Sequence, residues 1–359
     1  MKKVPGWIKS LLVFALVYLT VFQPIPYYIE RPGSIFGLNE MVEVAGETGD
    51  SAGEFYITTV GFRKVTPLLA LSSLLPYQDL VSEKELVGDN SSFEEYDAIQ
   101  QYYMESASNT AIQVAFDAAD IDYELDYNGV YVLQVIEESD FKDVLQIGDV
   151  VQAVDDQDFQ SSHDFIEYIS NLSVGDTVTI EYIRKGEEMI AIGELILLES
   201  GVAGIGIGLV DHSTLQTDPQ VNIHSGAIGG PSAGLMFSLQ IYNQLVDEDI
   251  LGANQIAGTG TIAPDGTVGR IGGAAKKVVA AEEAGVQYFL APDDEIPVEA
   301  IELYPELQTN YEEALEAAQD IDANLEVIPI KTFSDALEFL NGLLSEEAAY
   351  NLDDLRILA

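Results

Sequence analysis

A stretch of twenty residues without a charged side chain, from Ser10 to Ile29, constrains this chain more than any other feature of its sequence. As a helix rising about 1.5 Å per residue it would be roughly 30 Å long, which matches the hydrocarbon core of a lipid bilayer. Lysines precede it and aromatic residues lie near both of its ends, as is typical of membrane anchors (Lys2, Lys3, Lys9; Trp7, Tyr27, Tyr28). We therefore predict a cytoplasmic N-terminus and a single transmembrane helix within residues 1–28, with the rest of the chain outside the cell.

A cleaved signal peptide is the alternative for the same segment. Its cleavage site would need small residues after the apolar run, whereas residues 22–26 read Phe-Gln-Pro-Ile-Pro. We therefore favour an uncleaved anchor, which makes the membrane a partner of this chain.

The chain is strongly acidic, with 61 acidic and 15 basic side chains and a net charge of -46. Because binding to phosphate backbones needs clustered lysine and arginine, we expect no nucleic-acid partner. The hydrophobic fraction of 47% is too high for a disordered acidic chain. With no cysteine and only three histidines, none in an HExxH pair, we also expect no metal site (His163, His212, His224).

Residues 29–120 mix short apolar alternations with helix-like stretches at 66–86 and 92–119, separated by a polar loop at 88–92. No catalytic motif occurs in them. We interpret them as an N-terminal extracellular scaffold region that joins the anchor to the following domains. At the other end of the chain, we expect residues 347–359 to form an acidic C-terminal tail.

From residue 121 to residue 198 the pattern changes to short strands around one helical stretch. The sequences GDVVQAVD and GDTVTIEYIRKG, with the helix carrying Asp164, Phe165 and Ile169 between them, together resemble a bacterial PDZ domain, which has a β-sandwich-like fold. One departure is Asp-Asp-Gln at 155–157, where the family usually has an Asn-Gly turn. The resemblance implies that an extended peptide adds as a strand and contacts Asn128, Gly129, Val130 and Tyr131. A purely structural PDZ domain is the alternative.

A serine between glycines at the start of a helix is the first sign of chemistry. Residues 229–234 read Gly-Gly-Pro-Ser-Ala-Gly before a helical run. Small neighbours let a substrate backbone approach Ser232, and the backbone N–H groups of Ser232 and Ala233 can bind an oxyanion. The letters also fit the G-x-S-x-G elbow of α/β-hydrolases, but those need a histidine after the serine. All three histidines precede Ser232.

Lysine is the general base that remains downstream of Ser232, because arginine stays protonated. In the predicted helix 274–285, Lys277 shares a face with alanines, whereas Lys276 has Glu283 seven residues on. Burial lowers a lysine pKa from about 10.4 towards neutrality, as a base for serine requires. We therefore predict Lys277 as the base and Lys276 as a solvated neighbour that pairs with an acid. Thr259 and Thr261 could hydrogen-bond the lysine or be ordinary strand residues, and we expect His224 at the surface or at a strand end.

GGPSAG followed by GTGTIAPDGTVGRIGGAAKK resembles the proteolytic domain of Lon-type proteases, which we assign to residues 199–346. The resemblance implies an α/β fold and a catalytic dyad of Ser232 and Lys277. Gly229 stands where ATP-dependent members usually carry an acid, and no Walker A sequence occurs. We therefore expect no attached ATPase and no cofactor. Because Lon-type domains often form hexameric rings, a homo-oligomer and a monomer both stay open.

Anchor, PDZ domain and Lon-type domain in this order resemble the membrane-anchored PDZ–Lon-type proteases of Gram-positive bacteria. The fold class we predict is α+β multidomain. The resemblance implies an ATP-independent serine endopeptidase that cleaves secreted or surface peptides and proteins outside the cell, with the PDZ domain positioning the substrate. The alternative is a PDZ adaptor with a catalytically silent Lon-like domain, against which the intact Ser–Lys pair argues. A serine hydrolase of another class is weakened by the order of the histidines.

Overall fold

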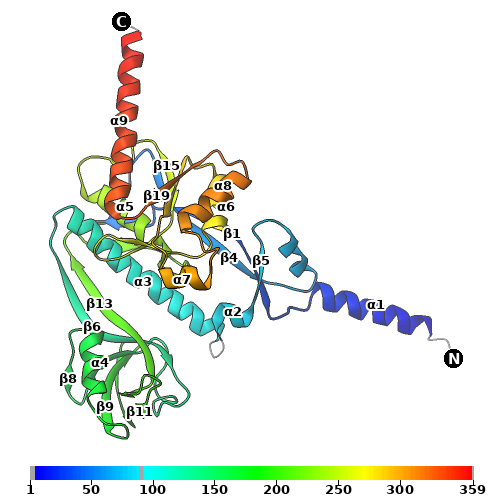
Figure 1. Ribbon diagram of the computed structural model, residues 1–359, viewed down its shortest axis with the longest axis vertical. Coiled ribbons are helices and arrows are strands. Elements are labelled where there is room, and N and C mark those ends of the chain that lie inside the picture. Colours follow the sequence, from blue (N-terminus) through cyan, green and yellow to red (C-terminus); the bar gives the residue numbers. More distant parts are fainter. Residues whose placement is uncertain (1–4, 89–91, 358–359) are drawn as a thin grey trace.

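The computed structural model describes residues 5–88 and 92–357. Lys2 and Lys3 of the predicted anchor, residues 89–91 of the predicted loop and residues 358–359 of the predicted tail lie outside these ranges. Figure 1 shows a central body from which three parts project in different directions: the N-terminal helix α1, the C-terminal helix α9 and a smaller β-rich domain.

Helix α1 spans Gly6–Val21, and none of its side chains is buried. The helix lies within the predicted segment 1–28 and ends before the uncharged run does. Pro24 and Pro26 lack the N–H group that a continuing helix needs, and strand β1 begins at Tyr27. Within the described ranges, no helix combines the length and the apolar character needed to cross a membrane.

The central body is built on a mixed six-stranded sheet. Its strands lie in the order β19 (Glu326–Ile330), β18 (Tyr288–Pro292), β15 (Gln255–Gly258), β4 (Glu54–Lys64), β1 (Tyr27–Gly37) and β5 (Asp79–Ser82). The first four are parallel, and β1 and β5 complete the sheet with antiparallel pairings. The expectation of a separate scaffold over residues 29–120 is therefore wrong. This region supplies β1, β4 and β5, and the last third of the chain supplies the other three strands of the same sheet.

Helices cover both faces of this sheet. Alternate residues of a strand point to opposite faces. Accordingly, Ile256 and Leu290 pack in one core with α3 (Phe93–Ala118), α5 (Gly234–Leu245) and α9 (Phe333–Ile357). Their neighbours Ala257 and Phe289 pack in a second core with α6 (Ala274–Ala284) and α8 (Asn310–Asp320). The body is thus a three-layer α/β unit, as predicted for the C-terminal domain alone.

The smaller domain is inserted into the body through the paired strands β6 (Tyr123–Val135) and β13 (Ile207–Thr217), which run out of the body and back (Figure 1). Its sheet has the order β10-β9-β7-β6-β13, formed with β7 (Val150–Val154), β9 (Thr177–Arg184) and β10 (Glu187–Glu194). Helix α4 (Ser162–Ser170) contributes Phe165 and Ile169 to its core. Because Ile205 is also part of that core, the domain extends beyond its predicted end at residue 198.

The remaining elements are short. They are β2 (Val42–Val44), β3 (Glu47–Thr48), η1 (Leu69–Leu74), α2 (Glu83–Val87), β8 (Gln157–Asp158), β11 (Ile196–Leu197), β12 (Ala203–Gly204), β14 (Val221–Ile223), η2 (Pro231–Ala233), β16 (Thr261–Ile262), β17 (Val268–Gly269) and α7 (Val298–Leu303). Strand β14 joins β2 and β3 in a small sheet. Residues 347–357, predicted as a tail, continue α9 to Ile357.

Candidate active site

The turn that carries Ser232 is held against helix α3 by its backbone. The N–H group of Gly230 donates to the carbonyl oxygen of Gln100 at 2.7 Å. Gly230 has φ of 90°, a left-handed conformation that glycine adopts without strain. Pro231 then opens the short helix η2, so that Ser232 lies directly before α5. The glycines and the proline of the motif thus place the serine at a helix start, as predicted.

Gly229 lies too close to α3 to carry a side chain. A Cβ atom there would be 2.8 Å from the Cβ atom of Gln100. This contact gives a physical reason for the absence of an acidic residue three positions before Ser232.

The backbone N–H groups of Ser232 and Ala233 are the first donors of the η2–α5 segment. Helix N-termini leave such donors without intrahelical partners. Ala233 belongs to the 3-10 turn of η2, and among the described residues the N–H group of Ser232 makes no backbone hydrogen bond outside the helices and strands. The oxyanion site at Ser232 and Ala233 stays a prediction, which the position of both residues at the start of a helical segment favours.

Lys277 reaches Ser232 from the other layer of the body. It lies one turn into α6, and its Nζ atom is 2.7 Å from Oγ of Ser232 and 2.8 Å from Oγ1 of Thr259. The hydroxyl group of Thr259 also donates to the carbonyl oxygen of Ser232 at 3.1 Å. Thr259 thus fixes both partners of the pair, whereas Thr261 pairs with Gly269 in the β16–β17 ladder.

Burial sets the protonation of Lys277. The side chain is enclosed, with 3% of the residue exposed. Desolvation disfavours the charged ammonium and lowers the pKa of Lys277 to about 7. A large share of the lysine is therefore a neutral amine at physiological pH, able to accept a proton from the hydroxyl group 2.7 Å away.

Replacing Lys277 with methionine is expected to stabilise the fold at low pH. The lysine pKa of about 7 in the folded state lies below about 10.4 in the unfolded chain. The unfolded state then binds more protons between these values, so wild-type stability rises with pH across that window. The gain from Lys277→Met should be on the order of 4 kcal/mol at pH 6 and shrink towards pH 10. Urea unfolding with Ser232→Ala as control measures it, and a gain that is constant with pH contradicts the depressed pKa.

Lys276 is buried rather than solvated, contrary to the prediction. Its Nζ atom lies 2.6 Å from a carboxylate oxygen of Asp79 and 3.4 Å from one of Glu30. Burial by itself lowers the pKa of Lys276, but the hydrogen bond to Asp79 and the charge of Glu30 raise it above its ordinary value. The surroundings therefore shift the pKa values of the two adjacent lysines in opposite directions. The predicted pairing with an acid is confirmed, but with Asp79 and Glu30 rather than Glu283.

The histidines lie away from this pair. His224 is 58% exposed on its side chain and faces Glu43 at 3.4 Å. Its surface position agrees with the prediction. Burial lowers the pKa of His212, which lies beside Tyr102 and Tyr131. No cluster of three or more acidic or histidine side chains able to hold a metal occurs in the described part of the chain.

The residues predicted to bind a peptide strand lie in a strand that already has two neighbours. Val130 pairs with Val151 of β7 on one side and with Asp211 of β13 on the other, and Tyr131 is paired on both sides in the same way. Asn128 and Gly129 face Thr214 and His212 of β13. The predicted binding strand is therefore wrong. The edge strands of this sheet are β10 and β13; β13 is the one that contacts helix α4, and its residues 207–210 are half-buried.

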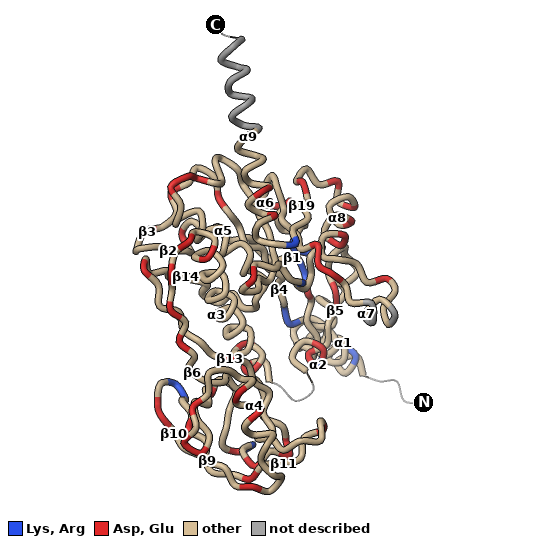
Figure 2. The backbone as a smooth tube through the Cα atoms, turned by 60° about the vertical axis from the view of Figure 1, so that its left-hand side comes forward, with Lys and Arg blue, Asp and Glu red and all other residues tan. Residues whose placement is uncertain are grey.

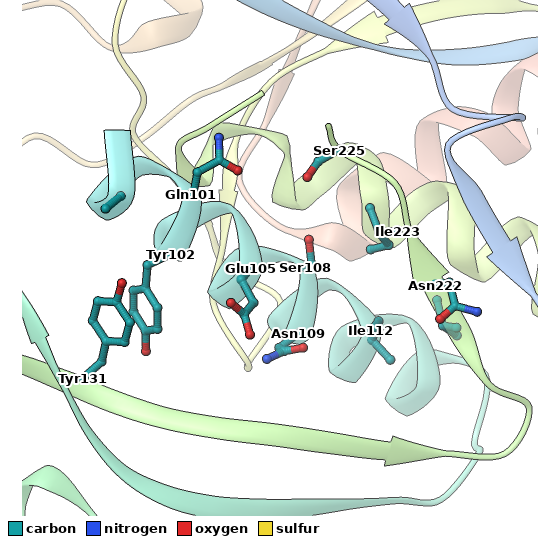
Figure 3. Close-up of a pocket in the computed structure, with 12 residues that line it drawn as sticks. Gln101, Tyr102, Glu105, Ser108, Asn109, Ile112, Tyr131, Asn222, Ile223 and Ser225 are labelled. Carbon is teal, nitrogen blue, oxygen red and sulfur yellow. The ribbon is translucent and has the colours of Figure 1, made fainter. Parts of the chain in front are cut away.

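Helix α3 joins the inserted domain to the nucleophile turn, which the sequence motifs did not indicate. Tyr102 stacks on Tyr131 of β6 with ring centroids 3.7 Å apart, and Gln100, two residues earlier, accepts the hydrogen bond of Gly230. A cavity of about 610 Å³ opens beside this contact, between α3, Tyr131 and the chain that leads to Ser232. Figure 3 shows side chains of α3 along one side of it and Asn222 and Ile223 along the other.

Two protein families match this chain. Residues 110–191 match the PDZ domain, and residues 197–339 match the family described as Lon protease (S16) C-terminal proteolytic domain. The second match includes Ser232 and Lys277.

Curated relatives of the chain are Lon proteases. The Lon protease of Desulfatibacillum aliphaticivorans is 27% identical over 178 residues, which cover 46% of this chain and 20% of the relative. The Lon protease of Clostridioides difficile (strain 630) is 32% identical over 143 residues, which cover 34% of this chain and 18% of the relative. The matched part thus spans about a fifth of the length of these relatives.

Solved structures similar to the chain include isolated PDZ domains. The PDZ domain of an SdrC-like protein from Listeria monocytogenes is 40% identical, covers 24% of this chain and 93% of that chain, and gives a TM-score of 0.23. The corresponding domain from Listeria innocua is also 40% identical, covers 23% and 96%, and gives a TM-score of 0.23.

Proposed function

We propose that this chain, which contains a PDZ domain and a Lon-type proteolytic domain, is an ATP-independent serine endopeptidase. The observation that carries the proposal is the contact of 2.7 Å between Nζ of Lys277 and Oγ of Ser232. A base that is neutral at physiological pH and touches a serine hydroxyl group is the arrangement that nucleophilic catalysis needs. No Walker A sequence accompanies it.

The proposed reaction is acyl transfer through Ser232. The neutral amine of Lys277 takes the hydroxyl proton while Oγ forms a bond to the carbonyl carbon of the scissile peptide. The carbonyl oxygen becomes negative and accepts hydrogen bonds from the N–H groups of Ser232 and Ala233. The ammonium of Lys277 then gives its proton to the leaving amine as the C–N bond breaks. Water attacks the resulting ester with Lys277 again as base, and the acid product leaves.

The PDZ domain is proposed to recruit substrate through the open edge of β13. Ile136 donates to the carbonyl oxygen of Gly206, so Gly206 faces β6 and the backbone groups of Ile207 point to the opposite, open edge. An extended peptide can pair there by main-chain hydrogen bonds. This arrangement assigns the peptide to β13 instead of the residues 128–131 first predicted.

Ile207→Pro is expected to raise KM for protein substrates about tenfold, because proline removes the N–H group that faces the open edge. Cleavage of peptides too short to reach both domains should stay within about twofold of wild type. Ile207→Val, which keeps the N–H group and most of the side chain, is the matched control. Steady-state kinetics on one long and one short substrate measure the split. An equal loss on both would contradict recruitment through β13.

The proposed activity is tested by incubating the full chain with a broad peptide mixture and without nucleotide. New peptide termini, identified by mass spectrometry, are the expected result, and adding Mg-ATP should not change their yield. Cleavage that needs ATP would remove the ATP-independent part of the proposal. If the wild type produces no new termini with or without ATP, the PDZ adaptor with a silent Lon-like domain is the better account.

We further propose that α1 anchors the protein in the cell membrane, with the catalytic domain on the outer side. Support comes from the exposed apolar side chains of α1, which include Leu12, Phe14 and Leu16. A helix that is apolar on all sides is normally covered by lipid or protein. Trp7, the one tryptophan of the chain, should be quenched by bromine-labelled lipids. Protease added to intact cells should digest the PDZ domain.

A further inference from the structure

A second apolar surface lies in the connection between β4 and β5. Residues 65–78 contain no charged side chain and include Pro67 and Pro76. We call residues 66–76 the leucine loop, because its large apolar side chains are leucines and all of them are exposed (Leu68, Leu69, Leu71, Leu74, Leu75). Leu74 is the most exposed, at 82%. Single exposed leucines are common, but five within eight residues form a patch that normally meets a partner.

The fold fixes these leucines in their exposed position. Thr66 is buried, and its carbonyl oxygen and hydroxyl group accept hydrogen bonds from Ala70 at 2.9 Å and Leu69 at 3.3 Å. These bonds start the helix η1 within the loop. The loop is therefore a folded element, and its leucines face solvent as part of its regular structure.

The leucine loop lies beside the end of α1. The N–H group of Leu68 donates to the carbonyl oxygen of Thr20 at 3.0 Å, and Ile25, after the helix, donates to Val65 at 2.9 Å. In Figure 1 the coil between β4 and β5 lies next to the point where α1 joins the body. The apolar surface of α1 thus continues onto the leucine loop.

The charge around this surface is mixed. From Gly61 to Gln78 the chain carries Arg63 and Lys64 and no acidic residue, but Lys64 pairs with Glu83 at 3.2 Å and Asp79 begins β5 directly afterwards. Arg31 lies nearby on β1, opposite Gly61 of β4. Figure 2 shows blue segments near α1 and below β4, with red segments of α2 close to α1. A second copy of this acidic chain would bring like charges together, whereas the interfacial layer of a lipid bilayer can cover the leucines without that repulsion.

We propose that the leucine loop inserts into the interfacial layer of the lipid bilayer next to α1. The proposal rests on the proposed anchoring by α1 and adds a second contact with the membrane. Two contacts with the bilayer restrict how far the body can tilt. A single helix would leave that tilt free. The Ser232 turn and the open edge of β13 are then held at a set height above the lipid.

Tryptophan quenching by brominated lipids tests the proposal on the full chain in vesicles of phosphatidylcholine and phosphatidylglycerol. In a Trp7→Phe background, Leu71→Trp and Leu74→Trp each place a single tryptophan on the leucine loop. Bromine-labelled lipids should reduce their emission at least twofold. Ile190→Trp in the same background is the matched control, because Ile190 is 68% exposed but lies on β10 of the inserted domain. Its emission should not change.

The outcomes separate the two membrane contacts. Brominated lipids could quench Trp7 in the wild type but leave the loop tryptophans as unquenched as the Ile190→Trp control. That result would overturn the leucine-loop contact and leave the α1 anchor intact. An unquenched Trp7 would remove the anchor and with it this proposal. A loop tryptophan whose emission depends on protein concentration but not on brominated lipid would assign the surface to a second copy of the chain, against the proposal.

Discussion

The Ser232→Ala variant is expected to lose at least about 10³-fold in kcat/KM for peptide cleavage, because the oxygen that forms the acyl-enzyme bond is removed. The Ser232 side chain contacts Lys277 through that same oxygen, and the turn is held by the backbone of Gly230. The fold should therefore survive the substitution. A continuous assay on a peptide found in the peptide-mixture experiment measures the loss.

Ser238→Ala is the matched control for this variant. Ser238 lies in the adjoining helix α5, is fully buried, and its hydroxyl group donates to Gly234 within the same helix. The same change of side chain at this position should leave kcat/KM within about threefold of the wild type. If Ser232→Ala and Ser238→Ala retain similar activity, Ser232 is not the nucleophile.

Activity is expected to rise with pH and then level off. Only the neutral form of Lys277 can accept the serine proton, and burial lowers the pKa of Lys277 to about 7. Below that value kcat/KM should increase about tenfold per pH unit, and above it the curve should become flat. Measurements between pH 5 and pH 9 in buffers of constant ionic strength test this profile.

Lys277→Arg separates the proton-accepting role from the charge. Arginine keeps a positive side chain of similar length but stays protonated at every pH of the assay. Its activity should be at least about 10³-fold below wild type at pH 8 and should show no rise with pH. A profile that is flat for the wild type, or a Lys277→Arg variant that follows the wild-type curve, would exclude Lys277 as the general base.

The contact between Ser232 and Lys277 was predictable because both residues lie in short contiguous motifs. Ser232 is marked by the glycines around it, and Lys277 by the glycines and alanines of its helix. The choice between Thr259 and Thr261 was not predictable. It depends on which residue of the chain 258–262 meets Lys277 in space, and Thr259 alone of the two makes that contact.

The predictions that were wrong concern contacts between segments that are far apart in the sequence. Strand β4 lies beside β15, which is about 200 residues further along the chain, as the hydrogen bond from Thr58 to Gly258 shows. No local pattern in residues 29–120 indicates that neighbour, and so these residues appeared to be a separate scaffold. Lys276 was placed in solvent for the same reason, because Asp79 and Glu30 reach it from β5 and β1.

The open edge of the PDZ sheet was missed because β13 follows the region in which the PDZ motifs occur. The motifs end before residue 198, but the strand that closes the sheet begins at Ile207. Periodicity identifies a strand without telling which edge it occupies. Residues 128–131 have the expected strand pattern and yet lie between two other strands.

Covalent labelling tests the Ser232–Lys277 account most directly. The full chain is treated with a fluorophosphonate, which reacts with activated serines, and the modified peptide is located by mass spectrometry. We expect a single adduct on Ser232, a labelling rate that rises with pH through about 7, and labelling at least about 10³-fold slower in Lys277→Met. An adduct on another serine, or labelling of Ser232 at the same rate without Lys277, would contradict it.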